Sequence, residues 1–252
     1  MIAAIGIDLG GTNVKLAIAS QEGELHGLSR FSTPEHGKVE PVVKLLASAV
    51  LALRQEAERR GDDVAGVGVG VAGWTDAERG IVRGAPNMEG WTDVPLRAIL
   101  EDRVQLPVFV DNDANAAAYA EAWVGAGRGC RSLVVLTLGT GVGGGIVLDG
   151  KIRRGSSGLA AEIGHMIVEP QGELCGCGCR GCLEAYASAT AVVREARRAI
   201  TSWSASGALA GFAGKLETLT AKDVAEAAKA GDALAAWILA EAGRHLGIAL
   251  AF

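Results

Sequence analysis

Four of the five cysteines lie close together in the stretch CGCGCRGCLE, as Cys175, Cys177, Cys179 and Cys182. His165 precedes this stretch by ten residues. Thiolates and imidazoles are ligands that structural zinc prefers, usually four of them in a tetrahedron. The spacing predicts a zinc site, but it leaves open whether the ligands are four cysteines or three cysteines and the histidine. Free thiols and a redox role are the two alternatives.

A second group of polar residues lies in FVDNDANAAAYAE, where a predicted strand ends and a predicted helix begins. Asn112 and Asp113 are residue types that commonly cap helices, so capping is one interpretation. The other is chemical, because α/β folds place ligands at the carboxyl ends of their strands. A carboxylate at this position is suited to accept the proton of a hydroxyl that attacks a phosphoryl group.

Two glycine-rich turns have matching contexts. GTGVGG, residues 139–144, fits the G-x-G-x-x-G pattern, yet the β-rich GGIVLDGK provides no helix to receive a dinucleotide pyrophosphate. DLGGTNVK, from Asp8 to Lys15, has the same strand-turn-strand design and adds a carboxylate and a cation. Two ordinary hairpins are the alternative. Together the turns predict a polyphosphate site in which Asp8 holds Mg²⁺ through water.

The elements that must position these residues alternate between strands and helices. Residues 2–9, 14–20 and 25–31 predict an antiparallel meander, and 39–61 predict an amphipathic helix that Gly61 ends. Further strands are expected at 64–73, 107–111, 132–139 and 145–150. Further helices are expected at 95–103, 114–127, 189–200 and 220–252. This order favours an α/β fold of two topologically related halves.

The composition indicates a chain that stays in a reducing compartment. The 252 residues carry a net charge of −5, and 49% of them are hydrophobic. MIAAIGIDLGG has no basic region typical of a signal peptide, and no run of 18 apolar residues suggests a membrane span. We therefore expect a cytoplasmic protein without structural disulfides. The mild acidity argues against nucleic acid or a membrane as partner.

The motifs together resemble the ROK family (repressor, open reading frame, kinase). They are GIDLGGTNVK, DNDANAAAYAE, GTGVGGGI, AAEIGH and CGCGCRGCLEAYAS, in this order. The last is most similar to bacterial glucokinases. The resemblance implies an actin-like ATPase fold, related to ribonuclease H, with two domains around a central cleft. The expected domains are 1–115, with the first turn and the catalytic aspartate, and 116–252, with the second turn and the zinc loop.

The resemblance also implies roles for individual residues. Asp113 matches the family's catalytic base, which would serve the sugar 6-hydroxyl, and Asn112 matches a sugar ligand. The zinc ligands match His165, Cys175, Cys177 and Cys182, which leaves Cys179 as a spare thiol. Further sugar contacts match Glu162, His165 and Glu184. Gly73 and Asn87 resemble positions lining the sugar site, although a turn glycine and a loop cap explain them equally well. The ATP phosphates and Mg²⁺ are expected at Asp8, Gly10, Gly11, Thr12, Asn13, Lys15, Gly139, Thr140 and Gly141.

These residues predict an ATP-dependent hexose kinase, with glucose as the expected acceptor, and a homodimer. Mannose, fructose, N-acetylglucosamine or N-acetylmannosamine are alternative acceptors, and a phosphate donor other than ATP is a further alternative. A sugar-binding regulator without catalysis is the alternative from another class. The resemblance implies a further C-terminal segment beyond LGIALAF, so we expect a truncated C-terminal part that lacks the adenosine contacts.

Overall fold

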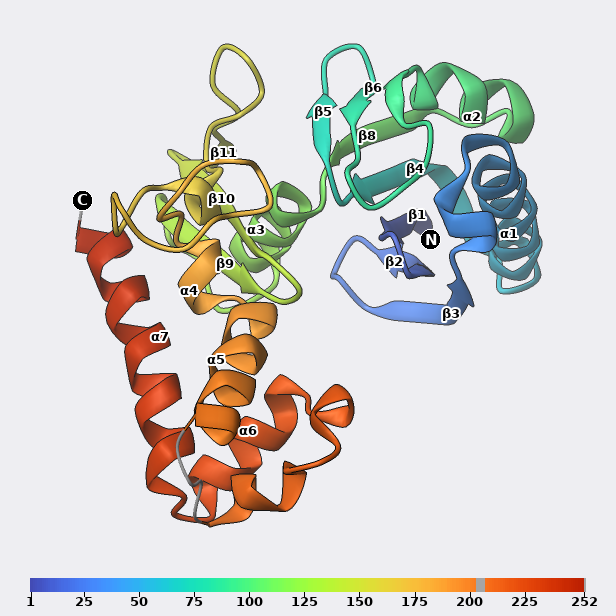
Figure 1. The fold of residues 1–252 in the computed structure, drawn as a ribbon. Helices are drawn as coiled ribbons and strands as arrows, with labels where there is room; N and C mark the ends of the chain where they lie inside the picture. Colours follow the sequence, from blue (N-terminus) through green and yellow to red (C-terminus); the bar gives the residue numbers. More distant parts are fainter. Residues whose placement is uncertain (203–206, 252) are drawn as a thin grey trace. The chain divides into compact units, whose positions relative to one another are not determined.

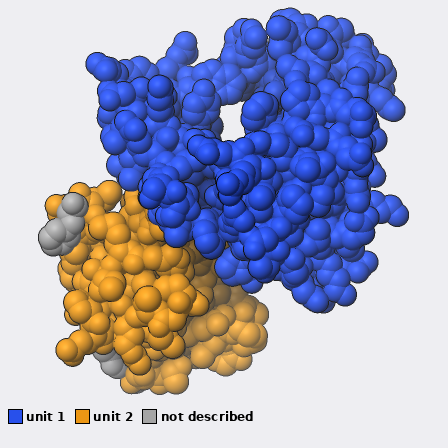
Figure 2. All heavy atoms as spheres, turned by 90° about the horizontal axis from the view of Figure 1, so that it is seen from above, with its two compact units in different colours: residues 1–135, 145–160 blue, residues 136–144, 161–252 orange. Residues whose placement is uncertain are grey.

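The computed structural model describes residues 1–202 and 207–251 and divides into two compact units (Figure 2). Unit 1 contains residues 1–135 and 145–160, and unit 2 contains residues 136–144 and 161–252. The chain therefore crosses between the units three times. The expected division of the functional residues between 1–115 and 116–252 stays a prediction.

Unit 1 is built on a five-stranded sheet with the order β3-β2-β1-β4-β8. β1 (Ile2–Leu9), β2 (Asn13–Ser20) and β3 (Leu25–Ser32) pair antiparallel, which confirms the predicted meander. β4 (Asp63–Val71) and β8 (Val108–Asn112) extend the sheet in parallel with β1. Parallel neighbours bring the carboxyl ends of β1, β4 and β8 to the same edge of the sheet.

The core of unit 1 lies between this sheet and two helices, α1 (Val39–Arg59) and α2 (Leu96–Val104) (Figure 1). Alternate residues of β1 are buried, as the period of two in a strand requires. Helix α1 ends at Arg59, and Gly61 adopts a φ of 79°, which confirms its predicted role as the stop. The short helix η1 (Pro34–Gly37) precedes α1.

The structure contains a small antiparallel sheet that was not predicted from the sequence. It is formed by β5 (Trp74–Asp76), β6 (Ile81–Gly84) and β7 (Thr92–Val94). Helix α3 (Asp113–Trp123) follows β8 directly. A further sheet has the order β11-β10-β9, formed by β9 (Leu133–Leu138), β10 (Val142–Leu148) and β11 (Lys151–Ile152). The division between the units falls within β9 and β10.

Unit 2 is mainly helical in its second half. It contains the short helix η2 (Ile163–His165), α4 (Glu184–Ala187) and α5 (Ala189–Ser202). After residue 206 follow η3 (Ala208–Phe212), η4 (Leu216–Thr218), α6 (Ala221–Lys229) and α7 (Ala233–Ala251). The expectation of continuous helix over 220–252 is wrong, because Gly231 adopts a φ of 90° and the Asp232 carboxylate accepts the first free amides of α7.

Helix α7 is long and apolar enough, by length and composition alone, to cross a membrane. It packs against α4, α5 and α6 within unit 2 (Figure 1). His245 of α7 is buried and stacks on Tyr186, with ring centroids 4.3 Å apart. A core helix of a globular unit meets the same length and composition test, so the expected absence of a membrane partner stays a prediction.

Candidate active site

Asn112 and Asp113 lie where β8 passes directly into α3. Asn112 caps the helix, because its Oδ1 accepts hydrogen bonds from the amides of Ala114 at 2.9 Å and Asn115 at 3.1 Å. Its Nδ2 donates to the carbonyl of Gly73 at 3.1 Å. The capping interpretation is therefore confirmed for Asn112, and its sugar contact stays a prediction.

The Asp113 carboxyl is the candidate base in unit 1. Burial raises the pKa of this carboxyl above its ordinary value, and the nearby Asp8 carboxylate raises it further. The Ala114 amide, which donates to Asp113 Oδ1 at 2.9 Å, opposes the shift in part. A raised pKa makes a carboxylate a stronger base, so this environment is suited to accepting a proton from a bound hydroxyl.

The first glycine turn joins β1 to β2. Gly10 donates to the carbonyl of Asn13 at 3.0 Å, while Thr33 donates its hydroxyl to Gly10 O at 2.7 Å and its amide to Thr12 O at 3.0 Å. Across the described part of the chain, no group accepts a hydrogen bond from the N–H of Gly11 or Thr12. These two adjacent amides remain available to an anion.

Two further predicted residues, Asn87 and Gly73, lie beside this turn or the candidate base. A Cβ at Gly11 would lie 2.6 Å from the backbone oxygen of Asn87, so Asn87 packs directly on the turn. Gly73 is equally constrained, because a Cβ there would lie 2.4 Å from the carbonyl oxygen of Gly84. Its own carbonyl accepts the hydrogen bond from Asn112. Unit 1 thus brings together Gly73, Asn87, Asn112 and the first turn.

Lys15 and Asp8 face each other across the β1–β2 register and form an ion pair with an Nζ to Oδ2 distance of 2.9 Å. Both side chains are about half exposed. Exposed pairs of this kind contribute little to stability, roughly 0–1 kcal/mol. The pair is therefore free to exchange for other partners, such as a phosphate for Lys15 and a hydrated cation for Asp8.

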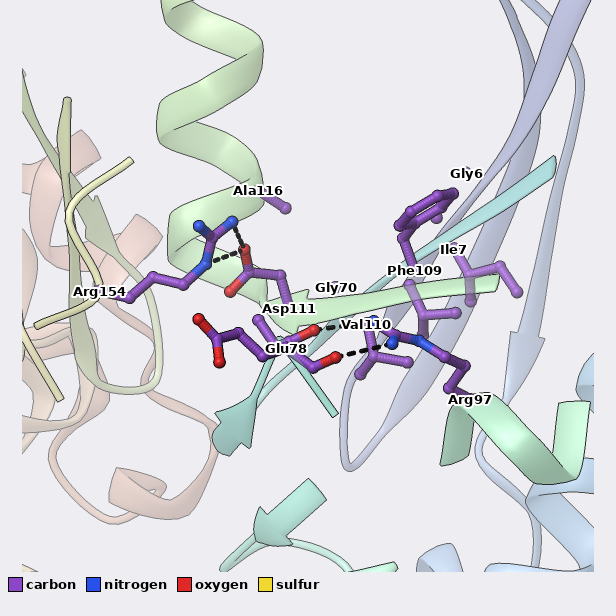
Figure 3. A pocket seen from close by; sticks show the side chains of 13 residues that line it. Gly6, Ile7, Gly70, Glu78, Arg97, Phe109, Val110, Asp111, Ala116 and Arg154 are labelled. Carbon is purple, nitrogen blue, oxygen red and sulfur yellow. Dashed lines mark hydrogen bonds and ion pairs between the residues drawn. The ribbon is translucent and has the colours of Figure 1, made fainter. Parts of the chain in front are cut away.

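Asp111 and Arg154 form an ion pair next to the candidate base that the sequence did not predict (Figure 3). Arg154 donates to Asp111 Oδ2 through Nε at 2.9 Å and through a second guanidinium nitrogen. Asp111 Oδ1 accepts hydrogen bonds from the Asn112 amide at 2.8 Å and from Asn115 Nδ2 at 3.2 Å. Asp111 thus connects the segment after β11 to the end of β8.

The two tryptophans near this site have different surroundings. Trp91 is only 2% exposed and donates its indole N–H to the carbonyl of Gly37, so it belongs to the core of unit 1. Trp74 is 43% exposed and donates to the carbonyl of Ser157 at 3.2 Å. Because Ser157 follows Arg154 by three residues, Trp74 is a second anchor of the segment after β11.

The second glycine turn lies in unit 2 between β9 and β10. Gly139 donates to the carbonyl of Gly141 at 3.0 Å. Within residues 1–202 and 207–251, no hydrogen bond is donated by the N–H of Thr140 or Gly141. The turn therefore offers two adjacent amides, as the first turn does. A strand and not a helix follows it, which confirms the predicted context.

The metal-ligating side chains of the cysteine loop converge within unit 2. The ligand atoms of His165, Cys175, Cys177 and Cys182 all lie within 4.8 Å of one another, with Cys179 outside the group. His165 Nδ1 lies 3.7 Å from Cys175 Sγ, and Cys177 Sγ lies 3.6 Å from Cys182 Sγ. In a tetrahedral zinc site with Zn–S bonds of about 2.3 Å, ligand atoms are about 3.7 Å apart. The residues therefore fit a zinc ion.

Glu162 and Glu184 lie at the two ends of this loop. Glu162 immediately precedes η2, which carries His165, and Glu184 begins α4 two residues after Cys182. Glu184 Oε1 lies 3.6 Å from Cys175 Sγ, and its Oε2 accepts the Val142 amide at 3.0 Å. Unit 2 thus brings Glu184 to both the cysteine loop and the second glycine turn.

Comparisons with known proteins give one consistent relationship. The model of the ROK family matches residues 4–252. The glucokinase of Thermotoga maritima is 43% identical over 235 residues, which are 93% of this chain and 72% of that protein. The solved ROK family glucokinase from Streptomyces griseus, in complex with glucose and AMPPNP, has a TM-score of 0.84 at 41% identity. The alignment covers 99% of this chain and 78% of that one.

A regulator has the same architecture. The solved ROK family transcriptional regulator described as a homolog of the E. coli MLC protein has a TM-score of 0.88 at 30% identity. The alignment covers 99% of this chain and 61% of the regulator. Fold similarity alone therefore does not separate a kinase from a regulator, and the residues of the site must do so.

Proposed function

The chain belongs to the ROK family, and we propose that it transfers the γ-phosphoryl group of ATP to glucose, giving glucose 6-phosphate and ADP. Its α/β architecture is the actin-like ATPase fold of the family's sugar kinases. One observation carries the proposal: Asp113 is a partly buried carboxyl with a raised pKa, directly after the end of a parallel strand. The glucokinase relatives support glucose as the acceptor.

In the proposed reaction, Asp113 accepts the proton of the sugar 6-hydroxyl as its oxygen bonds to the γ-phosphorus. The bond from that phosphorus to the bridging oxygen breaks, and ADP leaves with the electron pair. Asn112 holds the start of α3 and so fixes the direction of Asp113. Catalysis of phosphoryl transfer is mainly positioning and charge neutralisation, so the groups around the phosphates matter as much as the base.

We assign the phosphates to the two glycine turns. The free amides of Gly11 and Thr12 in unit 1, and those of Thr140 and Gly141 in unit 2, are the donors. Gly10, Asn13 and Gly139 close the turns, and Lys15 supplies a positive charge once it leaves Asp8. Asp8 would hold Mg²⁺, which neutralises phosphate charge when bound.

We assign the cysteine loop to zinc in a structural role, held by His165, Cys175, Cys177 and Cys182. Zinc, when bound, cross-links a loop that has little core of its own. Glu162, His165 and Glu184 are proposed sugar contacts, as are Gly73, Asn87 and Asn112. The homodimer, the cytoplasmic location and the lack of nucleic-acid and membrane partners stay predictions.

A sugar-responsive regulator is the second candidate, because the solved regulator has a TM-score of 0.88 with this chain. The environment of Asp113 favours the kinase, since a binding protein has no need for a buried carboxyl with a raised pKa. Other hexoses and other phosphate donors remain candidates for the same site.

The proposal is tested by measuring ADP release with Mg-ATP and a panel of glucose, mannose, fructose, N-acetylglucosamine and N-acetylmannosamine. Glucose is expected to give the highest kcat/KM. Asp113→Asn is expected to lower kcat by about 10²–10⁴-fold, the usual contribution of a general base. Asp102→Asn, on the exposed side of α2, is the control and should leave kcat unchanged. Folded, zinc-loaded protein that turns over none of these sugars would refute the proposed ATP-dependent hexose kinase.

A further inference from the structure

The backbone of the second glycine turn is held by residues that follow the cysteine loop. The carbonyl of Gly139 accepts the Ala189 amide at 2.9 Å. The carbonyl of Thr140 accepts the Thr190 hydroxyl at 2.8 Å. Both donors belong to the first turn of α5. Two successive carbonyls of the turn are therefore fixed from the same helix.

A third contact fixes the far side of the turn. Glu184 Oε2 accepts the amide of Val142, the first residue of β10, at 3.0 Å. A Cβ at Gly141 would lie 2.3 Å from this oxygen, so the carboxylate packs directly against the turn and would have to shift to admit a side chain there. The contacts from residues 184–190 thus occupy the outer groups of the turn. They leave the amides of Thr140 and Gly141 as the unused backbone donors of the turn within the described residues.

The Thr190 hydroxyl has no part in forming its own helix. Ser188 serves the start of α5, because its Oγ accepts the Ala191 amide at 3.1 Å. Thr190 is exposed, and its hydroxyl donates a hydrogen bond to the turn, 50 residues away in sequence. The hydroxyl therefore stabilises the turn and leaves the helix to other groups.

We propose that Thr190 is a positioning residue for the nucleotide, which holds the Thr140 carbonyl so that the amide of Gly141 is directed at the phosphates. The proposal rests on the proposed kinase function, since it assumes that this turn receives phosphate. A peptide unit has its carbonyl and the next amide in one plane. Fixing the Thr140 carbonyl therefore also fixes the orientation of the Gly141 N–H.

The test uses Thr190→Val, which removes the hydroxyl and keeps the branched shape, with Thr190→Ala as a second variant without the hydroxyl. The KM for ATP and the Kd for AMPPNP by calorimetry are expected to rise about five-fold, as the loss of one hydrogen bond of ordinary strength would give. The KM for glucose is expected to change by less than a factor of about two, and Thr190→Ser should restore the nucleotide values.

The matched control is Thr201→Val at the other end of α5. Its hydroxyl also donates to a backbone carbonyl at 2.8 Å, that of Arg197, but it is remote from the turn in sequence. If Thr190→Val, Thr190→Ala and Thr201→Val all bind AMPPNP as the parent does, the proposal is overturned. If KM for ATP and glucose rise together, a general structural role replaces it. A parent protein that binds no nucleotide would instead refute the kinase function itself.

Discussion

The ion pair between Arg154 and Asp111 allows a quantitative test of how strand β8, which leads to the proposed base, is held. Asp111 is mostly buried, with 20% of its side chain exposed, and Arg154 is 43% exposed. Two guanidinium nitrogens donate to a single carboxylate oxygen. The other oxygen accepts the amide of Asn112, next to the proposed base. We therefore expect this pair to stabilise unit 1 measurably.

The expected magnitude follows from these exposures. Fully exposed ion pairs contribute about 0–1 kcal/mol, whereas hydrogen bonds to charged groups contribute about 1.5–3 kcal/mol when they are shielded from water. One buried partner and one exposed partner place this pair between the two ranges. We expect a coupling energy of about 1–1.5 kcal/mol, after discounting the solvent screening of Arg154.

The assay is a double-mutant cycle of Arg154→Met and Asp111→Asn, with unfolding in urea followed by circular dichroism and tryptophan fluorescence. Asparagine keeps an oxygen for the amides of Asn112 and Asn115, and it replaces the oxygen that faces Arg154 with an NH2 group, so both the charge and the acceptor for Arg154 are lost. The control cycle uses the ion pair of Arg131 and Asp149, which has the same residue types and a nitrogen-to-oxygen distance of 2.9 Å. The side chains of this pair are 84% and 65% exposed. Its coupling energy should lie below about 0.5 kcal/mol.

A coupling energy for Arg154 and Asp111 no larger than that of the control pair would refute the reasoning. It would mean that burial of Asp111 does not strengthen the pair. The two spectroscopic probes must give coincident transitions, because the coupling energy is defined only for cooperative unfolding.

Three further predictions concern the site. Because burial raises the pKa of Asp113, kcat/KM should fall as pH drops through that raised value, and Asp113→Asn should remove this limb. The folded state then binds the proton of Asp113 more tightly than the unfolded state does. The free energy of unfolding therefore falls as pH rises from the pKa of Asp113 in the unfolded state to its pKa in the folded state. Asp113→Asn should therefore unfold at higher urea at pH 7, and a lower midpoint would contradict the shift. Gly11→Ala should raise the KM for ATP about ten-fold, since its Cβ would lie 2.6 Å from the backbone oxygen of Asn87. Gly6→Ala is the control, because a Cβ there meets open space, and it should leave the KM for ATP unchanged. Chelation of zinc should lower the midpoint of thermal unfolding by about 5 °C or more, with metal content measured alongside. The same treatment should leave the thermal midpoint of Cys182→Ser unchanged. Equal midpoints with and without metal would exclude a structural ion.

The strands and helices that follow one period of burial were predictable from the sequence. The first strand has the predicted bounds, and α1 ends at Arg59, two residues before the glycine that was expected to stop it. The small sheet of β5, β6 and β7 was missed because two of its strands have only three residues, too few to show a period. The helical stretch 220–252 was continued through Gly231 because one glycine in an alanine-rich pattern is a weak stop signal.

The residues of the candidate site also divide into those that were predictable from the sequence and those that were not. Residue type and short spacing predicted a zinc site at the cysteine cluster. The family resemblance selected His165, Cys175, Cys177 and Cys182 as its ligands, and the structure brings those four together. Arg154 and Thr190 were missed. Each acts on a group more than 40 residues away through one side-chain contact, and an arginine or threonine in a polar stretch gives no sign of its partner. Only the packed chain shows those contacts.

The two glycine turns present the same pair of free amides, but they are held in different ways. The first is fixed by Thr33, which follows the end of the adjacent strand β3. The second is fixed by residues 184–190, and Glu184 faces Val142 with one oxygen and Cys175 with the other. Because the cysteine loop leads directly into that segment, Glu184 contacts both the loop and the turn. The shape of the second turn therefore depends on the segment after the cysteine loop, whereas the shape of the first depends on the residue that follows a strand of its own sheet.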